Sequence, residues 1–378
     1  MATRTNPDPG PPADADRDMP DELHPRHLAV RVLEVVVIVG LVAVAVTALP
    51  GLGDVRDRLD NAQPVWIAAV IVAEIASCAG YLLVFRSTFC PQMSWGLSYD
   101  IAMAELAANS LLPTGGAGGL ALGVWALHKA GMSTEHIARR TVAFFILTSA
   151  PNFVGVVIFG LAMFAGVLPG DASFALTLVP ALIAGGVILV VWLSPELLRK
   201  FGASLADANT DDWSGRARHG IRKGLVAAAD GVELAKRLIR SRSFGVVVGS
   251  VTYLAFDIAA LGFAFAAVRS VPPFGPLVMA YLLGQLGNLI PLPGGVGGTE
   301  AGLVGGFALY HVDVTLATAA VLTYRLFQLV IPALLGAPAF VMLRRKLANG
   351  QGRAQVCGPL AVDTIELPRV TLPASSRG

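Results

Sequence analysis

The sequence is short of charge. Only 14% of its 378 residues are Asp, Glu, Lys or Arg, and 54% are hydrophobic, whereas soluble domains carry about 25% charged residues. A surface this poor in charge does not keep a globular protein of this length dispersed in water. The composition also excludes disorder over most of the chain, and a nucleic-acid-binding role. It indicates an integral membrane protein instead.

Cysteines and catalytic motifs are scarce as well. The three cysteines, Cys78, Cys90 and Cys357, form no CxxC and no Cys/His cluster with zinc spacing. They therefore exclude a disulfide framework and predict no metal site. The sequence contains no GxSxG, HExxH or Walker A motif, so we expect neither a cofactor nor enzymatic activity.

Six apolar runs are long enough to span a membrane. The residues before them, Met1–His27, lack the apolar stretch of a signal peptide and predict a disordered tail. Each run has at least about 20 residues, enough to cross ~30 Å of hydrocarbon as a helix. We expect spanning helices at Leu28–Leu49, Val65–Phe85, Thr141–Leu168, Phe174–Leu193, Phe244–Val268 and Leu316–Leu343. The membrane domain then covers 28–343, and 344–378 forms a second tail.

Two further apolar regions are interrupted by glycine and proline. The region 99–130 is cut by PTGGAGG at 113–119, and the region 277–310 is cut by PLPGGVGG. The pieces on either side of each cut are too short to span the bilayer. Such backbone is tolerated in a membrane only where protein or a watery cavity covers it. Both regions therefore predict re-entrant helical hairpins.

The basic residues are distributed unevenly along the chain. Most of the 28 Lys and Arg residues lie in the two tails, the short loops on the same face, and the loop 194–243, which alone holds ten. Arg56, Arg58 and Arg269 fall on the other face. The positive-inside rule then places both termini and the long loop in the cytoplasm.

The two interrupted regions resemble each other. NSLLPTGGAGG begins at Asn109, and NLIPLPGGVGG begins 179 residues later at Asn288. At that offset one asparagine and four glycines coincide, and the flanking apolar helices coincide too. The unit of helix, hairpin and helix thus occurs twice, at about 65–168 and 244–343. The expected topology makes the two halves inverted, which is typical of secondary transporters. Close helix packing by small residues is the alternative explanation of the glycines.

These motifs resemble a known family. ELAANSLLPTGGAGG, GNLIPLPGGVGGTEAG and TYRLFQLVIPALLG are similar to the flippase-like membrane domain of lysylphosphatidylglycerol synthases and its stand-alone bacterial relatives. The similarity covers roughly 65–343. It implies a lipid-translocating domain of a bacterial cell membrane. The synthases carry a soluble aminoacyl-transferase domain after the membrane part. Only 344–378 follow here, so we expect that activity to be absent.

One cation lies deep in the expected membrane domain. Arg325 is nine residues into the last expected helix, about 14 Å at 1.5 Å per residue. Glu300 opens the second arm of the second hairpin, at a similar depth. We expect the two to form an ion pair. Such a pair either holds the hairpin against the last helix or serves as a gate or substrate contact.

Three further acids lie at membrane depth. Glu74 and Asp257 are in equivalent helices, and Glu105 is one turn from Asn109. Ionised acids without partners are not stable in lipid, so we expect some of these to be protonated or to face water. This suggests proton coupling or recognition of a cationic or zwitterionic headgroup. Carboxyls satisfied by neighbouring backbone are the alternative.

The second arm of each hairpin starts at the glycine break. Its N-terminal N–H groups and positive dipole end then point into the middle of the membrane, where they suit a phosphate headgroup. The asparagines add hydrogen-bonding capacity, or else cap the broken helices. The predicted substrate-binding residues are Asn109, Pro113, Gly115, Gly116, Asn288, Pro293, Gly294, Gly295, Glu300 and Arg325.

The sequence therefore predicts an all-α polytopic membrane protein that moves a phospholipid or lipid-linked headgroup between leaflets. A secondary transporter of a soluble solute and a membrane scaffold for a lipid-modifying enzyme are the alternatives. Membrane lipids are the expected partners. The segment 215–242 predicts an amphipathic helix that could bind anionic lipid headgroups, but an ordinary positive-inside cytoplasmic loop is the simpler explanation of its charge. The sequence leaves open whether a second copy of the chain or a partner enzyme also binds.

Overall fold

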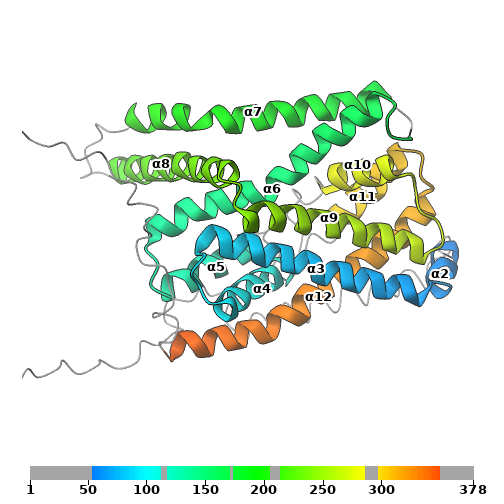
Figure 1. The fold of residues 1–378 in the computed structure, drawn as a ribbon, viewed down its shortest axis with the longest axis horizontal. Coiled ribbons are helices and arrows are strands. Elements are labelled where there is room, and N and C mark those ends of the chain that lie inside the picture. The colour runs from blue at the N-terminus through cyan, green and yellow to red at the C-terminus, as the bar shows by residue number, and fades with distance from the viewer. Residues whose placement is uncertain (1–52, 112–116, 171–172, 205–212, 286–296, 350–378) are drawn as a thin grey trace, which may run out of the picture.

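The computed structural model describes residues 53–111, 117–170, 173–204, 213–285 and 297–349, and Figure 1 shows how their helices are arranged. Over these ranges the regular structure is entirely helical, with eleven helices labelled α2 to α12. Five of the helices are long and apolar enough to cross a membrane. The all-α polytopic fold predicted from the sequence is confirmed.

The five long helices correspond to five of the six expected spans. In lipid a helix satisfies its backbone groups internally, so uninterrupted apolar runs fold as single helices. The sixth expected span, Leu28–Leu49, lies outside the described residues. The long helices are α3 (Pro64–Phe89), α6 (Thr134–Phe164), α7 (Phe174–Ser204), α9 (Phe244–Ala267) and α12 (Val314–Ala348).

Several of these helices continue beyond the apolar stretch. α6 begins at Thr134 rather than Thr141, and α12 continues to Ala348, so 344–348 are helical and not part of an irregular tail. A helix does not end where the hydrophobic residues end, because its hydrogen bonds continue through polar residues. Arg345 and Lys346 lie in the last turn of α12, where the helix dipole favours positive charge.

Each interrupted region forms a pair of short helices. The first pair is α4 (Trp95–Leu111) with α5 (Ala117–Lys129), and the second is α10 (Phe274–Gly284) with α11 (Gly298–Leu309). None of the four has the roughly 20 residues needed to cross the bilayer. The helices of each pair pack against each other. The two pairs lie toward opposite ends of the bundle (Figure 1).

Glycines bring neighbouring helices close together. A Cβ atom added to Gly80 on α3 would lie 2.5 Å from the backbone nitrogen of Tyr253 and 2.8 Å from the carbonyl oxygen of Gly249 on α9. A Cβ on Gly336 of α12 would lie 2.3 Å from the carbonyl oxygen of Met103 on α4. Small residues permit this backbone-to-backbone contact, which drives helix association in lipid.

The buried apolar side chains form two clusters. One joins α4 and α5 to the C-terminal half of α3, with Phe85 and Phe89 fully buried. The other joins α10 and α11 to α9 and the N-terminal half of α12, with Phe265 and Phe307 fully buried. Each hairpin therefore has its own core.

Two helices lie at the ends of the bundle. The short helix α2 (Gly53–Asp60) lies at the end opposite α8 (Trp213–Arg240), which runs beside α7 (Figure 1). α8 confirms a helix in the predicted amphipathic segment. One of its faces packs on α6 and α7, and Arg199 of α7 pairs with Asp230 at 3.0 Å and Glu233 at 2.9 Å.

Candidate functional site

Asp257 accepts hydrogen bonds from two tyrosines in the interior of the bundle. It lies in the middle of α9 and is 7% exposed. The hydroxyl of Tyr281 on α10 donates to Oδ2 at 2.5 Å, and the hydroxyl of Tyr324 on α12 donates to Oδ1 at 2.7 Å. Hydrogen bonds to a carboxylate are strong in a medium of low dielectric. They tie α9, α10 and α12 together around one carboxyl group.

Gln328 extends this contact toward the arginine. Its amide nitrogen donates to both oxygens of Asp257 at 3.3 Å and to the hydroxyl of Tyr324. Its carbonyl oxygen accepts from the guanidinium of Arg325 at 2.5 Å. The side-chain amide of Gln328 thus donates through its nitrogen to the carboxyl group and accepts through its oxygen from the guanidinium, because an amide has both a donor and an acceptor.

Arg325 and Glu300 form the ion pair that the sequence suggests. Nε of Arg325 on α12 lies 2.9 Å from Oε1 of Glu300, with both side chains mostly buried. The other carboxyl oxygen of Glu300 accepts from the backbone N–H of Gly297 at 2.6 Å. Gly297 has a positive φ of 91° and precedes the first residue of α11, a conformation that glycine adopts without strain. The pair therefore joins α12 to the point where α11 begins.

Together these side chains form one polar network across α9, α10, α11 and α12. Burying a polar group inside a membrane costs free energy, so such groups are retained where they form a functional site or fix how the helices align. Removing one member of a buried ion pair typically costs about 3–5 kcal/mol, because the partner charge stays buried. The network consists of Asp257, Tyr281, Gly297, Glu300, Tyr324, Arg325 and Gln328.

Glu74 lies next to this network on α3. Its side chain is 2% exposed, and it interacts electrostatically with Asp257 and Arg325. Its Oε1 atom has no hydrogen-bond partner among the residues that the structure describes. The structure thus brings Glu74, Asp257, Glu300 and Arg325 into one region, whereas the sequence predicted only the pairing of Glu300 with Arg325.

Asn109 has a structural contact. Its Oδ1 accepts from the backbone N–H of Gly119 at 2.9 Å, so the end of α4 caps the first turn of α5. A Cβ on Gly119 would lie 2.3 Å from that oxygen. Of the two roles proposed for this asparagine, helix capping is the one that its observed contact serves.

Glu105 lies apart from the arginine, in the first hairpin. It is 2% exposed, and its carboxyl group interacts electrostatically with Tyr81 of α3. It fits beside α5 because position 123 is glycine, whose added Cβ would lie 2.8 Å from the carboxyl group. In the second hairpin the glycine is on the first helix and the large side chain is on the second, since Gly284 of α10 leaves room for Leu303 of α11.

Tyr281, Tyr324 and Gln328 were not among the site residues predicted from the sequence. The signal was present, because hydroxyl and amide groups in apolar helices need buried partners, and Tyr324 and Gln328 are close to Arg325 in the chain. Seven predicted binding residues lie outside the described residues. They are Pro113, Gly115, Gly116, Asn288, Pro293, Gly294 and Gly295.

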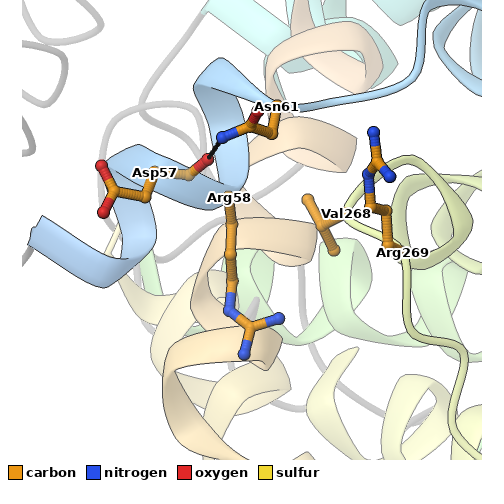
Figure 2. Close-up of a pocket in the computed structure, with 5 residues that line it drawn as sticks. All are labelled: Asp57, Arg58, Asn61, Val268 and Arg269. Carbon is orange, nitrogen blue, oxygen red and sulfur yellow. Dashed lines mark hydrogen bonds between the residues drawn. The ribbon is translucent and has the colours of Figure 1, made fainter.

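A separate pocket of about 270 Å³ lies between α2 and the end of α9. It shares no residue with the polar network. Figure 2 shows its lining, with Asn61 donating to the backbone oxygen of Asp57 at 2.8 Å. The two arginines of the lining extend in different directions in this view. Within the described ranges no group of three His, Cys, Asp or Glu residues could hold a metal ion.

Comparison with known proteins agrees with this architecture. The chain is 33% identical over 96 residues to a UPF0104 membrane protein of Methanothermobacter thermautotrophicus. That alignment covers 25% of this chain and 27% of the relative. A family model described as the lysylphosphatidylglycerol synthase TM region matches residues 31–336. Because this match covers well over half of the chain, the protein belongs to the family of lysylphosphatidylglycerol synthase TM regions.

Proposed function

We propose that the protein moves a phospholipid or lipid-linked headgroup between the two leaflets, while the acyl chains stay in the bilayer. The observation that carries this proposal is the buried ion pair of Glu300 and Arg325 at the interruption of the second hairpin. Arg325 is eleven residues into α12, about 16 Å along the helix. A lipid headgroup has to cross this depth, and polar groups there are otherwise costly.

The contacts of Glu300 indicate how a phosphate would bind. Its carboxyl group accepts from the Gly297 N–H and from the Arg325 guanidinium. A headgroup phosphate is an acceptor for the same two donors, at the positive end of the α11 dipole. The Glu300 carboxylate thus occupies the position that a headgroup phosphate would take. If a phosphate replaced Glu300 at these two donors, the contact between α11 and α12 would be released.

The arrangement of the hairpins supports transport. The order of long helix, hairpin and long helix occurs twice, as α3–α6 and α9–α12, and the hairpins lie toward opposite ends of the bundle (Figure 1). Inverted repeats with broken helices are common in secondary transporters. We assign the protein to a bacterial cell membrane, with both termini in the cytoplasm and the basic helix α8 near anionic headgroups.

A leaflet-distribution assay tests the proposal. The full chain is reconstituted into liposomes with a panel of fluorescent lipids, and a membrane-impermeant quencher reports the movement of each lipid. We expect at least one lipid to move faster than in empty liposomes, and Arg325→Ala to abolish the effect. Arg199→Ala removes an arginine from a surface ion pair and is the matched control. If no lipid moves faster than in empty liposomes, the proposal is wrong.

A further inference from the structure

Three carboxyl groups lie around one guanidinium group in the polar network. Glu300 is bound to Arg325, Asp257 is linked to it through Gln328, and Glu74 interacts electrostatically with both Asp257 and Arg325. If all three acids were ionised, the cluster would carry an excess of two negative charges in an apolar interior. Isolated charges are very costly there, so protonation of at least one acid, which lowers the excess to one negative charge, is favoured.

The hydrogen bonds show which acid holds the proton. Asp257 accepts from Tyr281, Tyr324 and Gln328, which together stabilise a carboxylate. Glu300 accepts from a backbone N–H and a guanidinium. Glu74 is 2% exposed, and no described residue donates to its Oε1. Glu74 is therefore the acid of the three that binds a proton most readily, because among the described residues it has the fewest donors to stabilise a buried carboxylate.

Other charged and titratable groups face Glu74 from the helices packed on α3. The groups on α9 and α12 interact electrostatically with the carboxyl group of Glu74. Cys78 lies one turn from Glu74 on α3 itself. On α4, Glu105 interacts with Tyr81. On α6, Arg140 donates to the backbone of Thr88 at the far end of α3. The facing groups are Cys78, Tyr253, Asp257, Tyr324 and Arg325.

We propose that Glu74 is the proton-binding site of a proton-coupled lipid transporter, an inference that rests on the proposed function. When the O–H bond of Glu74 breaks, its proton passes to water on one side of the membrane. The carboxylate left behind competes with Glu300 for Arg325 and so frees the start of α11. Proton uptake from the other side restores the neutral acid and the Glu300–Arg325 pair. No other bond changes, and the pH gradient is the energy source.

The experiment measures lipid movement in the same liposomes with and without a pH gradient of one unit. We expect the gradient to change the initial rate of the wild-type protein by up to about tenfold, the ratio of proton activities across the membrane. Glu74→Gln mimics the neutral acid. Because a neutral side chain leaves the Glu300–Arg325 pair closed, this variant should move lipid more slowly than the wild-type protein without a gradient and show no response to one. Glu74→Asp keeps a titratable group and should retain the response.

Glu105→Gln is the matched control, since it neutralises another buried acid that lies outside the Arg325 cluster. It should respond to the gradient like the wild-type protein. A pH-sensitive dye inside the liposomes gives a second readout, and lipid-dependent proton entry should disappear in Glu74→Gln. A full gradient response in Glu74→Gln overturns the inference. Equal wild-type rates with and without a gradient overturn it too, but leave the proposed function intact. No lipid movement under any condition overturns both.

Discussion

Tyr281 on α10 and Asp257 on α9 are joined by a buried hydrogen bond of 2.5 Å. The first hairpin also has a tyrosine–acid contact, but the two residues are exchanged between the helices. Tyr81 lies on the long helix α3, and Glu105 lies on the short helix α4. Each hairpin is thus attached to its neighbouring long helix by a buried contact between a tyrosine and an acid. These contacts hold helices that are too short to be anchored by crossing the bilayer.

Replacing Tyr281 by phenylalanine should destabilise the fold more than an ordinary Tyr→Phe change. A hydrogen bond to a charged acceptor contributes about 1.5–3 kcal/mol, and one to a neutral acceptor about 0.5–1.5 kcal/mol. Tyr310→Phe is the matched control, because the hydroxyl of Tyr310 donates to the carbonyl oxygen of Leu176 at 2.7 Å. Denaturant titration in mixed micelles measures both free energies of unfolding. Equal losses would contradict an ionised Asp257.

A double-mutant cycle on Glu300 and Arg325 should show strong coupling. Arg325→Met leaves a buried carboxylate without its cation, and such a change typically costs about 3–5 kcal/mol. Glu300→Gln keeps an acceptor for the Gly297 N–H and removes only the charge. We expect the double variant to be more stable than Arg325→Met alone. Additive losses in the unfolding free energy would show that the pair contributes no interaction of its own.

The sequence was sufficient to predict the five spans that the structure describes, and part of the site. A helix needs a fixed length of apolar residues to cross lipid, so α3 and α9 could be located from hydrophobicity alone. The pairing of Glu300 with Arg325 followed from their common depth and opposite charge. The spans and the ion pair were both predicted from the positions of residues along the chain, which the sequence gives directly.

Other features depend on how the helices are rotated about their axes. Tyr281 and Tyr324 reach Asp257 because α10 and α12 present those faces to α9, and hydrophobic residues all around a helix do not specify its rotation. The capping role of Asn109 depends on the return of α5 beside the end of α4. The continuation of α6 and α12 into polar sequence reflects hydrogen bonding rather than hydrophobicity.

The crossing of α3 and α9 should not tolerate a side chain at Gly80. A methyl group there would meet the backbone of Tyr253 and Gly249, so the helices would have to separate and lose close packing. Gly186 of α7 has no atom within 4 Å of an added Cβ and is the control. We expect Gly80→Ala to lower the melting temperature, whereas Gly186→Ala gains up to about 1 kcal/mol in helix propensity. A Gly80→Ala protein as stable as wild type would rule out this close contact.

The orientation in the membrane can be tested with single cysteines in a chain whose own cysteines are replaced by serine. Ser241 follows α8 and Ser270 follows α9, and both are exposed at opposite ends of a long helix. The positive-inside rule places Ser241 in the cytoplasm. An impermeant thiol reagent added to intact cells should therefore label Ser270→Cys and leave Ser241→Cys unlabelled until the cells are opened. The reverse pattern would invert the proposed topology.

Asn109→Ala should cost stability without abolishing lipid movement. Removing a helix cap costs about 1 kcal/mol, because the Gly119 N–H loses its acceptor. Ser110→Ala is the neighbouring control, since that hydroxyl donates only to the Leu106 carbonyl within the same helix, and it should change the unfolding free energy by less than about 0.5 kcal/mol. If Asn109 serves as a cap alone, the rate of lipid movement per folded protein stays close to that of Ser110→Ala. A stable Asn109→Ala protein that moves no lipid would instead place this asparagine in contact with the headgroup, and both hairpins would then contribute to the path.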